Sequence, residues 1–161
     1  MGLIVGDIDA QVSYTLLSTL PFDADAFGGM AWAIGGNVLD DPGLVGRVYG
    51  GYGSEISSGC CFVPSTDTSG RLRMTRVGTT LSVYYWSGLG WQFMDSASIP
   101  GEPSSMGIFV GVNTGTPVSF AFDDFQLQAD GFTGVPEPGS TALVGISLAF
   151  IWGFGKRLLG R

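Results

Sequence analysis

The sequence predicts an all-β domain, built as a two-sheet β-sandwich and followed by a single apolar C-terminal helix. Only 13% of the 161 residues are charged, too few for the solvent-exposed faces of a helical bundle, and 27 glycines suit a fold with many turns. Short segments of alternating apolar and polar residues recur along the chain up to residue 127. The composition then changes to a proline-rich stretch and fifteen uncharged residues. This length and pattern fit one domain with an appendage.

The pattern divides the chain into three parts. We expect the β-sandwich over residues 1–130, a linker over 131–134 and a tail over 135–161, whose helix spans 141–155. The segment Met1–Asp7 has no basic region and no apolar run, so it is not a signal peptide. Because the chain begins almost directly in a strand, we expect the natural start to lie upstream.

The strands are expected where apolar residues recur at every second position. Ile8 to Leu16 is the clearest case, with polar residues at each intervening position. Residues 21–29, 57–60, 64–70 and 99–105 are expected to be loops. Before Asp123-Asp124 the apolar residues occupy even-numbered positions, and after it they occupy odd-numbered positions. This switch predicts a β-bulge. The expected strands cover residues 8–16, 30–34, 45–52, 71–77, 80–86, 91–94, 106–112 and 118–127, and residues 61–63 are a short apolar piece in an otherwise irregular segment.

The most readable element is a hairpin around Gly78-Thr79. Glycine at the first central position favours a type II′ turn, which pairs Val77 with Thr80 and fixes every pair further out. One face is then mostly apolar and should face the core; it carries Leu72, Met74, Arg76, Leu81, Val83 and Tyr85. The other face should meet solvent, with Arg73 opposite Tyr84 and Arg71 opposite Trp86 as cation–π pairs.

Charge and missing residue types exclude several functions. The chain has no histidine, which excludes Ser-His-Asp and Cys-His chemistry and removes the commonest transition-metal ligand. Residues 1–134 carry 4 basic and 13 acidic side chains, a balance of −9 that argues against nucleic acid as a partner. Cys60 and Cys61 are adjacent and should not bridge each other. They are either small residues in a loop or strand, or form a disulfide with another chain.

Metal binding and catalysis have little support. Asp40-Asp41 and Asp123-Asp124 are hard oxygen ligands that suit Ca²⁺, although adjacent acids in turns more often cap or are solvated, and we expect no cofactor. A glycoside hydrolase needs two carboxylates at a defined separation. Glu55 and Glu102 lie in Gly- and Pro-rich segments, Glu137 lies in the tail, and no Glu-x-Asp-x-x-Glu strand is present. We expect a protein that is not an enzyme.

The tail has the chemistry of a membrane segment. As a helix, residues 141–155 would span about 22 Å, short of a hydrocarbon core of about 30 Å but able to insert with bilayer thinning. Trp152 suits the interface, and the basic end (Lys156, Arg157 and Arg161) should stay cytoplasmic, with the body on the far side. The alternative is a buried helix that closes the domain.

This tail closely resembles the PEP-CTERM sorting signal of Gram-negative bacteria. The resemblance covers the last 27 residues: Val135, Pro136, Glu137 and Pro138, then the apolar run, then the basic end. It implies that an exosortase, a membrane protease, recognises and cleaves this chain as a substrate. The protein would be inserted in the membrane through its helix and, after processing, reside at the cell surface or outside a biofilm-forming cell. The lack of a signal peptide is the one departure from the pattern.

Residues 71–91, and Phe120 to Phe125 later, resemble the central hairpins and closing strand of concanavalin A-like lectin/glucanase domains. The resemblance implies a jelly-roll with a carbohydrate-binding concave face. Aromatic rings stack on sugars, which makes Tyr84, Trp86 and Trp91 candidates, with Arg71 and Arg73 as hydrogen-bond donors. Two alternatives stay open: Trp91 belongs to the core and the Arg–aromatic pairs only stabilise the sheet, or the domain is a structural biofilm-matrix protein without a small ligand.

Overall fold

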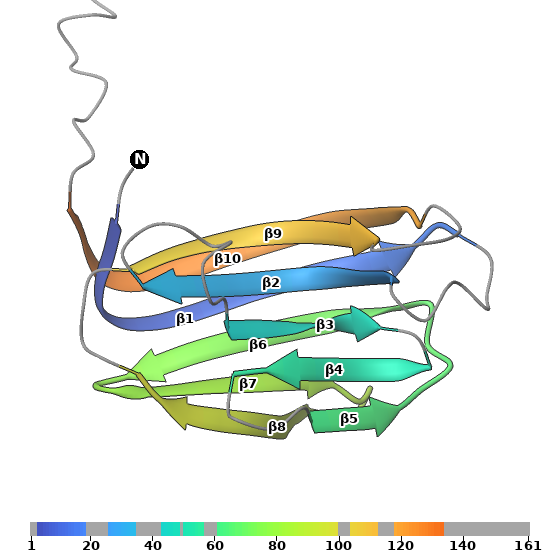
Figure 1. Ribbon diagram of the computed structural model, residues 1–161, viewed down its shortest axis with the longest axis horizontal. Coiled ribbons are helices and arrows are strands. Elements are labelled where there is room, and N and C mark those ends of the chain that lie inside the picture. Colours follow the sequence, from blue (N-terminus) through green and yellow to red (C-terminus); the bar gives the residue numbers. More distant parts are fainter. Residues whose placement is uncertain are drawn as a thin grey trace, which may run out of the picture.

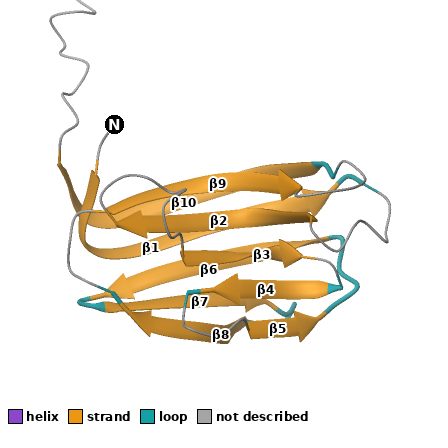
Figure 2. Cartoon of the chain, in the orientation of Figure 1, coloured by secondary structure: helices purple, strands orange, loops and turns teal. Residues whose placement is uncertain are grey.

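A computed structural model describes residues 3–18, 26–34, 43–48, 50–56, 61–99, 104–112 and 118–133. Within these ranges the chain forms strands and turns and no helix, which confirms the all-β prediction (Figure 2). The tail, with the predicted helix 141–155, lies outside the described residues. The strands are β1 (Leu3–Leu16), β2 (Ala26–Ile34), β3 (Gly43–Val48), β4 (Gly51–Glu55), β5 (Cys61–Pro64), β6 (Ser69–Val77), β7 (Thr80–Trp86), β8 (Trp91–Ser98), β9 (Ser104–Val112) and β10 (Phe120–Thr133).

The strands form one antiparallel sheet in the order β5-β4-β3-β2-β9-β1-β6-β7-β8, and β10 pairs with β1. The sheet curls until it is nearly closed, like a barrel, with β3 and β4 lying over β6 and β7 (Figure 1). The sheet has two five-stranded halves, β5-β4-β3-β2-β9 and β10-β1-β6-β7-β8, and among the described residues one strand pair, Ile4 with Ser104, joins them. The expected two sheets are therefore hydrogen-bonded into one.

A bend in β1 makes this junction. The register of β1 against β10 shifts between Val5 and Ile8, and Figure 1 shows the strand turning sharply near its start. Arg76, only 2% exposed, holds the bend: its Nε donates to the Gly6 carbonyl at 2.8 Å and one terminal nitrogen donates to Ser104 Oγ at 3.1 Å. Its guanidinium also lies 5.1 Å from the centre of the Trp32 ring. Arg76 thus links β6, β1 and β9 inside the core.

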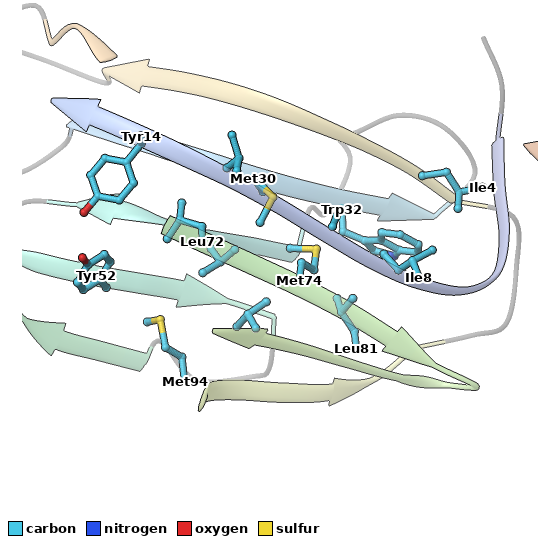
Figure 3. Close-up of a cluster of buried hydrophobic side chains, with 14 residues drawn as sticks. Ile4, Ile8, Tyr14, Met30, Trp32, Tyr52, Leu72, Met74, Leu81 and Met94 are labelled. Atoms are coloured by element: carbon cyan, nitrogen blue, oxygen red, sulfur yellow. The ribbon is translucent and has the colours of Figure 1, made fainter. Parts of the chain in front are cut away.

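The core lies between the two halves of the sheet. Side chains from β2 and β4 (Met30, Trp32 and Tyr52) meet side chains from β6 and β7 (Leu72, Met74 and Leu81), as Figure 3 shows. Burial raises the pKa of Tyr14 and of Tyr52, so both phenols stay protonated at neutral pH. The packing of the two halves against each other is the main favourable term of folding, because each Å² of apolar area removed from water contributes about 25 cal/mol.

The predicted hairpin and bulge are both confirmed. Residues 72–77 pair with residues 80–85 in the predicted register, from Val77 with Thr80 to Leu72 with Tyr85. Gly78 has a φ of 58°, the value that the first central position of a type II′ turn requires. On β10, Asp124 has a φ of 51° where the register against β1 shifts between Gln11 and Ser13. The parity change in the sequence therefore does mark a bulge.

Several expected boundaries are wrong, mostly in glycine-rich segments. Residues 45–52 are not one strand: β3 ends at Val48 and β4 begins at Gly51. β2 begins at Ala26, β6 at Ser69 and β9 at Ser104, inside segments expected to be loops, and β10 runs through residues 131–133, which were expected to be linker. Glycines leave no side chain to alternate, so the period-2 signal disappears from strands that are still paired.

Candidate functional site

The outward side of the half-sheet that contains β1, β6, β7 and β8 carries a mixed aromatic and polar surface. Leu72, Met74 and Arg76 point inward from β6 and are buried, so the alternating residues Arg71 and Arg73 point outward. The same parity brings residues of three neighbouring strands beside them. We call this surface the aromatic–arginine face; it consists of Asp9, Gln11, Arg71, Arg73, Tyr84, Trp86, Trp91 and Phe93.

Two cross-strand aromatic pairs join β7 to β8. Trp86 lies opposite Trp91 with ring centres 5.3 Å apart and planes at 81°, an edge-to-face contact. Tyr84 lies opposite Phe93 at 5.8 Å and 72°. A register shift between Val83 and Tyr84 keeps both pairs outward while Met94 enters the core. Phe93 is 59% exposed and the other three rings are partly exposed, so a ligand can reach all four.

Both arginines lie against these rings. The guanidinium carbon of Arg71 is 5.7 Å from the Trp86 ring centre and 5.2 Å from that of Trp91. The corresponding atom of Arg73 is 5.7 Å from the ring centres of Tyr84 and Trp91. All four distances are within the range of cation–π attraction. The contacts hold the rings in defined orientations before any ligand arrives.

The two arginines differ in their polar partners. Arg73 binds Asp9 in a bidentate pair, with Nε to Oδ1 at 2.9 Å and a terminal nitrogen to Oδ2 at 2.6 Å. These hydrogen bonds raise the pKa of Arg73. Arg71 instead donates to the neutral Gln11 amide oxygen at 3.0 Å. The charge of Arg73 is therefore balanced on the face, whereas that of Arg71 is not.

The structure brings all five predicted binding residues together, and the alternative interpretation of Trp91 as a core residue is wrong. Sequence reasoning did not include Asp9, Gln11 or Phe93. Phe93 had a visible signal, since it follows Trp91 by two residues and shares its face. Asp9 and Gln11 could be recognised as outward positions of a strand. Nothing near them in the sequence shows that this strand pairs with β6, which lies more than 50 residues further along the chain.

The other candidate sites are mostly beyond the described part of the chain. Asp40-Asp41, Glu102, Val135, Pro136, Glu137, Pro138 and the basic end Lys156, Arg157 and Arg161 lie outside it. Asp123 Oδ1 accepts a hydrogen bond from the Asp124 backbone at 2.8 Å, which is a capping role in the bulge. Across the described ranges, no three acidic, cysteine or histidine side chains gather closely enough to hold a metal ion. Cys61 is a partly exposed free thiol on β5.

The described ranges contain no helix of the length and apolar character that crossing a bilayer requires.

Comparison with known proteins supports the fold alone. No protein-family profile and no curated protein matches the sequence. Among solved structures, the chain is similar to the crystal structure of a functionally unknown protein from Saccharomyces cerevisiae, with a TM-score of 0.59 and 15% identity. The similarity covers 80% of this chain and 73% of the yeast chain. At this identity the likeness extends to the arrangement of strands.

Proposed function

We propose that this protein is an exported, non-catalytic polysaccharide-binding module, a jelly-roll-like sandwich sorted by a PEP-CTERM-like tail. The observation that carries the binding proposal is the Trp86–Trp91 pair, held by Arg71 on a solvent-exposed face. Its partners would be an extracellular polysaccharide and an exosortase-type protease. With a balance of −9 on residues 1–134, nucleic acid is not a proposed partner.

The chemistry of the face suits sugar rings. Exposed indoles lose contact with water when an apolar sugar face stacks on them, and they carry few rotatable bonds, so little side-chain entropy is lost on binding. Arg71 and Arg73 fix the rings further, which reduces the cost of ordering the site. If the role of the rings were purely structural, each cross-strand pair would contribute only about 0.2–1 kcal/mol to the stability of the sheet.

The binding test is Trp86→Ala, with Leu89→Ala as the matched control. Leu89 is 98% exposed in the turn that joins the same two strands, so its loss removes an apolar surface residue without touching the stacked rings. We expect Trp86→Ala to weaken polysaccharide binding about tenfold or more, and Leu89→Ala to leave it unchanged. Glycan arrays followed by affinity electrophoresis would measure this.

Two outcomes of that test would contradict the proposal. One is that the unaltered protein binds no glycan on the array. The other is that Trp86→Ala and Leu89→Ala bind as well as the unaltered protein. Either result would favour a structural matrix protein whose aromatic pairs only stabilise the sheet.

The sorting proposal rests on the order of the three tail parts, the 135–138 motif, the apolar run and the basic end. In an exosortase-containing bacterium, with a secretory leader supplied before Met1, we expect the unaltered chain to yield a shortened product in the surface or medium fraction. We expect Glu137→Ala to accumulate uncleaved in the membrane fraction. Glu102→Ala, outside the motif, is the control. Intact mass measurement of each fraction shows whether the chain has been cleaved. Cleavage of the Glu137→Ala chain identical to that of the unaltered chain would refute an exosortase signal.

A further inference from the structure

The four basic side chains of residues 1–134 have unequal surroundings. Arg47 and Arg76 are 0% and 2% exposed, and both donate to backbone carbonyl oxygens. Arg73 is paired with Asp9 through two hydrogen bonds. Among the described residues, Arg71 is the one partly exposed cation of this set whose hydrogen-bond partner is neutral. The sheet therefore presents one unbalanced positive charge on the aromatic–arginine face.

The position of Arg71 suits an anion. Its guanidinium lies against the rings of Trp86 and Trp91, which exclude water from one side of it. Gln11 uses its amide oxygen to hold one terminal nitrogen, which leaves further N–H donors of the planar fork for a ligand. Such a fork binds a carboxylate or a sulfate through two parallel hydrogen bonds, and a partly desolvated site strengthens them.

We infer that Arg71 binds the anionic group of an acidic polysaccharide while a neighbouring sugar ring stacks on Trp86. This inference rests on the proposed polysaccharide-binding function and specifies its ligand class. The group would be the carboxylate of a uronic acid or a sulfate ester. The rest of the domain carries an excess of acidic side chains that repels a polyanion. Retention of an acidic polymer therefore requires a local cation, and Arg71 supplies it.

The test compares three soluble polymers by affinity electrophoresis and calorimetry: polygalacturonate, dextran sulfate and neutral dextran. We expect the unaltered protein to bind one or both acidic polymers in preference to dextran. Arg71→Gln should weaken that binding about ten- to a hundredfold, the effect of losing a charge-assisted hydrogen bond. Arg71→Lys should recover only part of it, since lysine keeps the charge but not the planar fork.

The control is Thr79→Glu, which changes the net charge by the same amount as Arg71→Gln. Thr79 is exposed in the turn between β6 and β7, outside the aromatic–arginine face, so this variant should change acidic-polymer binding far less than Arg71→Gln. Circular dichroism and the urea midpoint of each variant establish that it is folded.

The outcomes separate this inference from the function on which it rests. If dextran binds as well as the acidic polymers, and Arg71→Gln changes neither while Trp86→Ala abolishes both, the inference is wrong and the polysaccharide-binding proposal stands. If none of these polymers and no glycan on the array is retained, the proposed function itself fails. Preference for polygalacturonate identifies a uronate, and preference for dextran sulfate identifies a sulfate ester.

Discussion

Replacing Arg47 with methionine is expected to lower the free energy of unfolding by about 3–5 kcal/mol. Arg47 is fully buried on β3, yet its partners are all backbone carbonyl oxygens. Methionine fills much of the volume of the arginine stem but donates nothing, so four carbonyl oxygens lose a buried guanidinium donor. The acceptors are Asp67 at 3.0 Å from Nε, Val48 and Ser65 each at 2.8 Å from a terminal nitrogen, and Gly51.

The effect is large because Arg47 holds two chain segments at once. Val48 and Gly51 are the strand residues on either side of the connection between β3 and β4, and Ser65 and Asp67 belong to the connection between β5 and β6. Tyr52 adds to the same junction, since its hydroxyl is 3.2 Å from Asp67 Oδ2 and its ring lies 5.8 Å from the Arg47 guanidinium. Loss of Arg47 therefore frees both connections.

Urea unfolding followed by tryptophan fluorescence and far-UV circular dichroism measures this difference. Arg71→Met is the matched control, because it makes the same chemical change on the solvent-exposed face and should cost less than about 1 kcal/mol. A loss below about 1 kcal/mol for Arg47→Met would show that the buried guanidinium contributes no more than the exposed one.

Gly29→Ala is expected to destabilise the domain by about 3 kcal/mol, at the upper end of the usual cost of overpacking. Gly29 on β2 pairs with Gly46 on β3, and a Cβ built on Gly29 would lie 2.1 Å from the Val45 carbonyl oxygen and 2.5 Å from the Gly46 Cα. Both neighbours are backbone atoms, which cannot rotate away as a side chain does. An alanine must push β2 and β3 apart.

Gly107→Ala on the adjacent strand β9 is the matched control for this second variant. Among the described residues, no atom beyond the two chain neighbours lies within 4 Å of the Cβ that would be added there. That substitution should be neutral or stabilise by about 0.5–1 kcal/mol, because alanine loses less backbone entropy than glycine on folding. The same urea titration compares them, and equal stability of Gly29→Ala and Gly107→Ala would contradict the close approach of β2 and β3.

Local patterns were sufficient to predict the elements whose contacts are close in sequence. The Gly78-Thr79 turn fixed the β6–β7 register, and with it the outward position of Arg71 and Arg73. The parity change at Asp123-Asp124 located the bulge. Both inferences depend on neighbours within a few residues, where the period-2 rule and turn geometry are strong constraints.

The remaining features depend on pairings between distant segments. The ion pair of Asp9 with Arg73 joins residues that are 64 apart in the sequence. Only this pairing shows that the charge of Arg73 is neutralised while that of Arg71 is not. Nothing near Arg47 in the sequence indicates that it is buried, because its burial depends on a distant connection that supplies the carbonyl oxygens of Ser65 and Asp67. The close approach of Gly29 and Gly46 could not be predicted, because nothing near either residue in the sequence shows that β2 pairs with β3. Strand order is set by such long-range contacts, which composition and periodicity do not encode.

The pairing of β1 also orients the module relative to its attachment point. Leu3 pairs with Thr133 at one end of β1, whereas Ser13 pairs with Arg71 near the other. Thr133 is the last described residue before the tail and lies at one pole of the sheet, whereas the Trp86–Trp91 pair lies toward the opposite pole. If the proposed tail attaches the module to a membrane, the indole pair lies at the pole opposite the last described residue before the tail. Attachment and the proposed polysaccharide binding would then use different ends of the sheet.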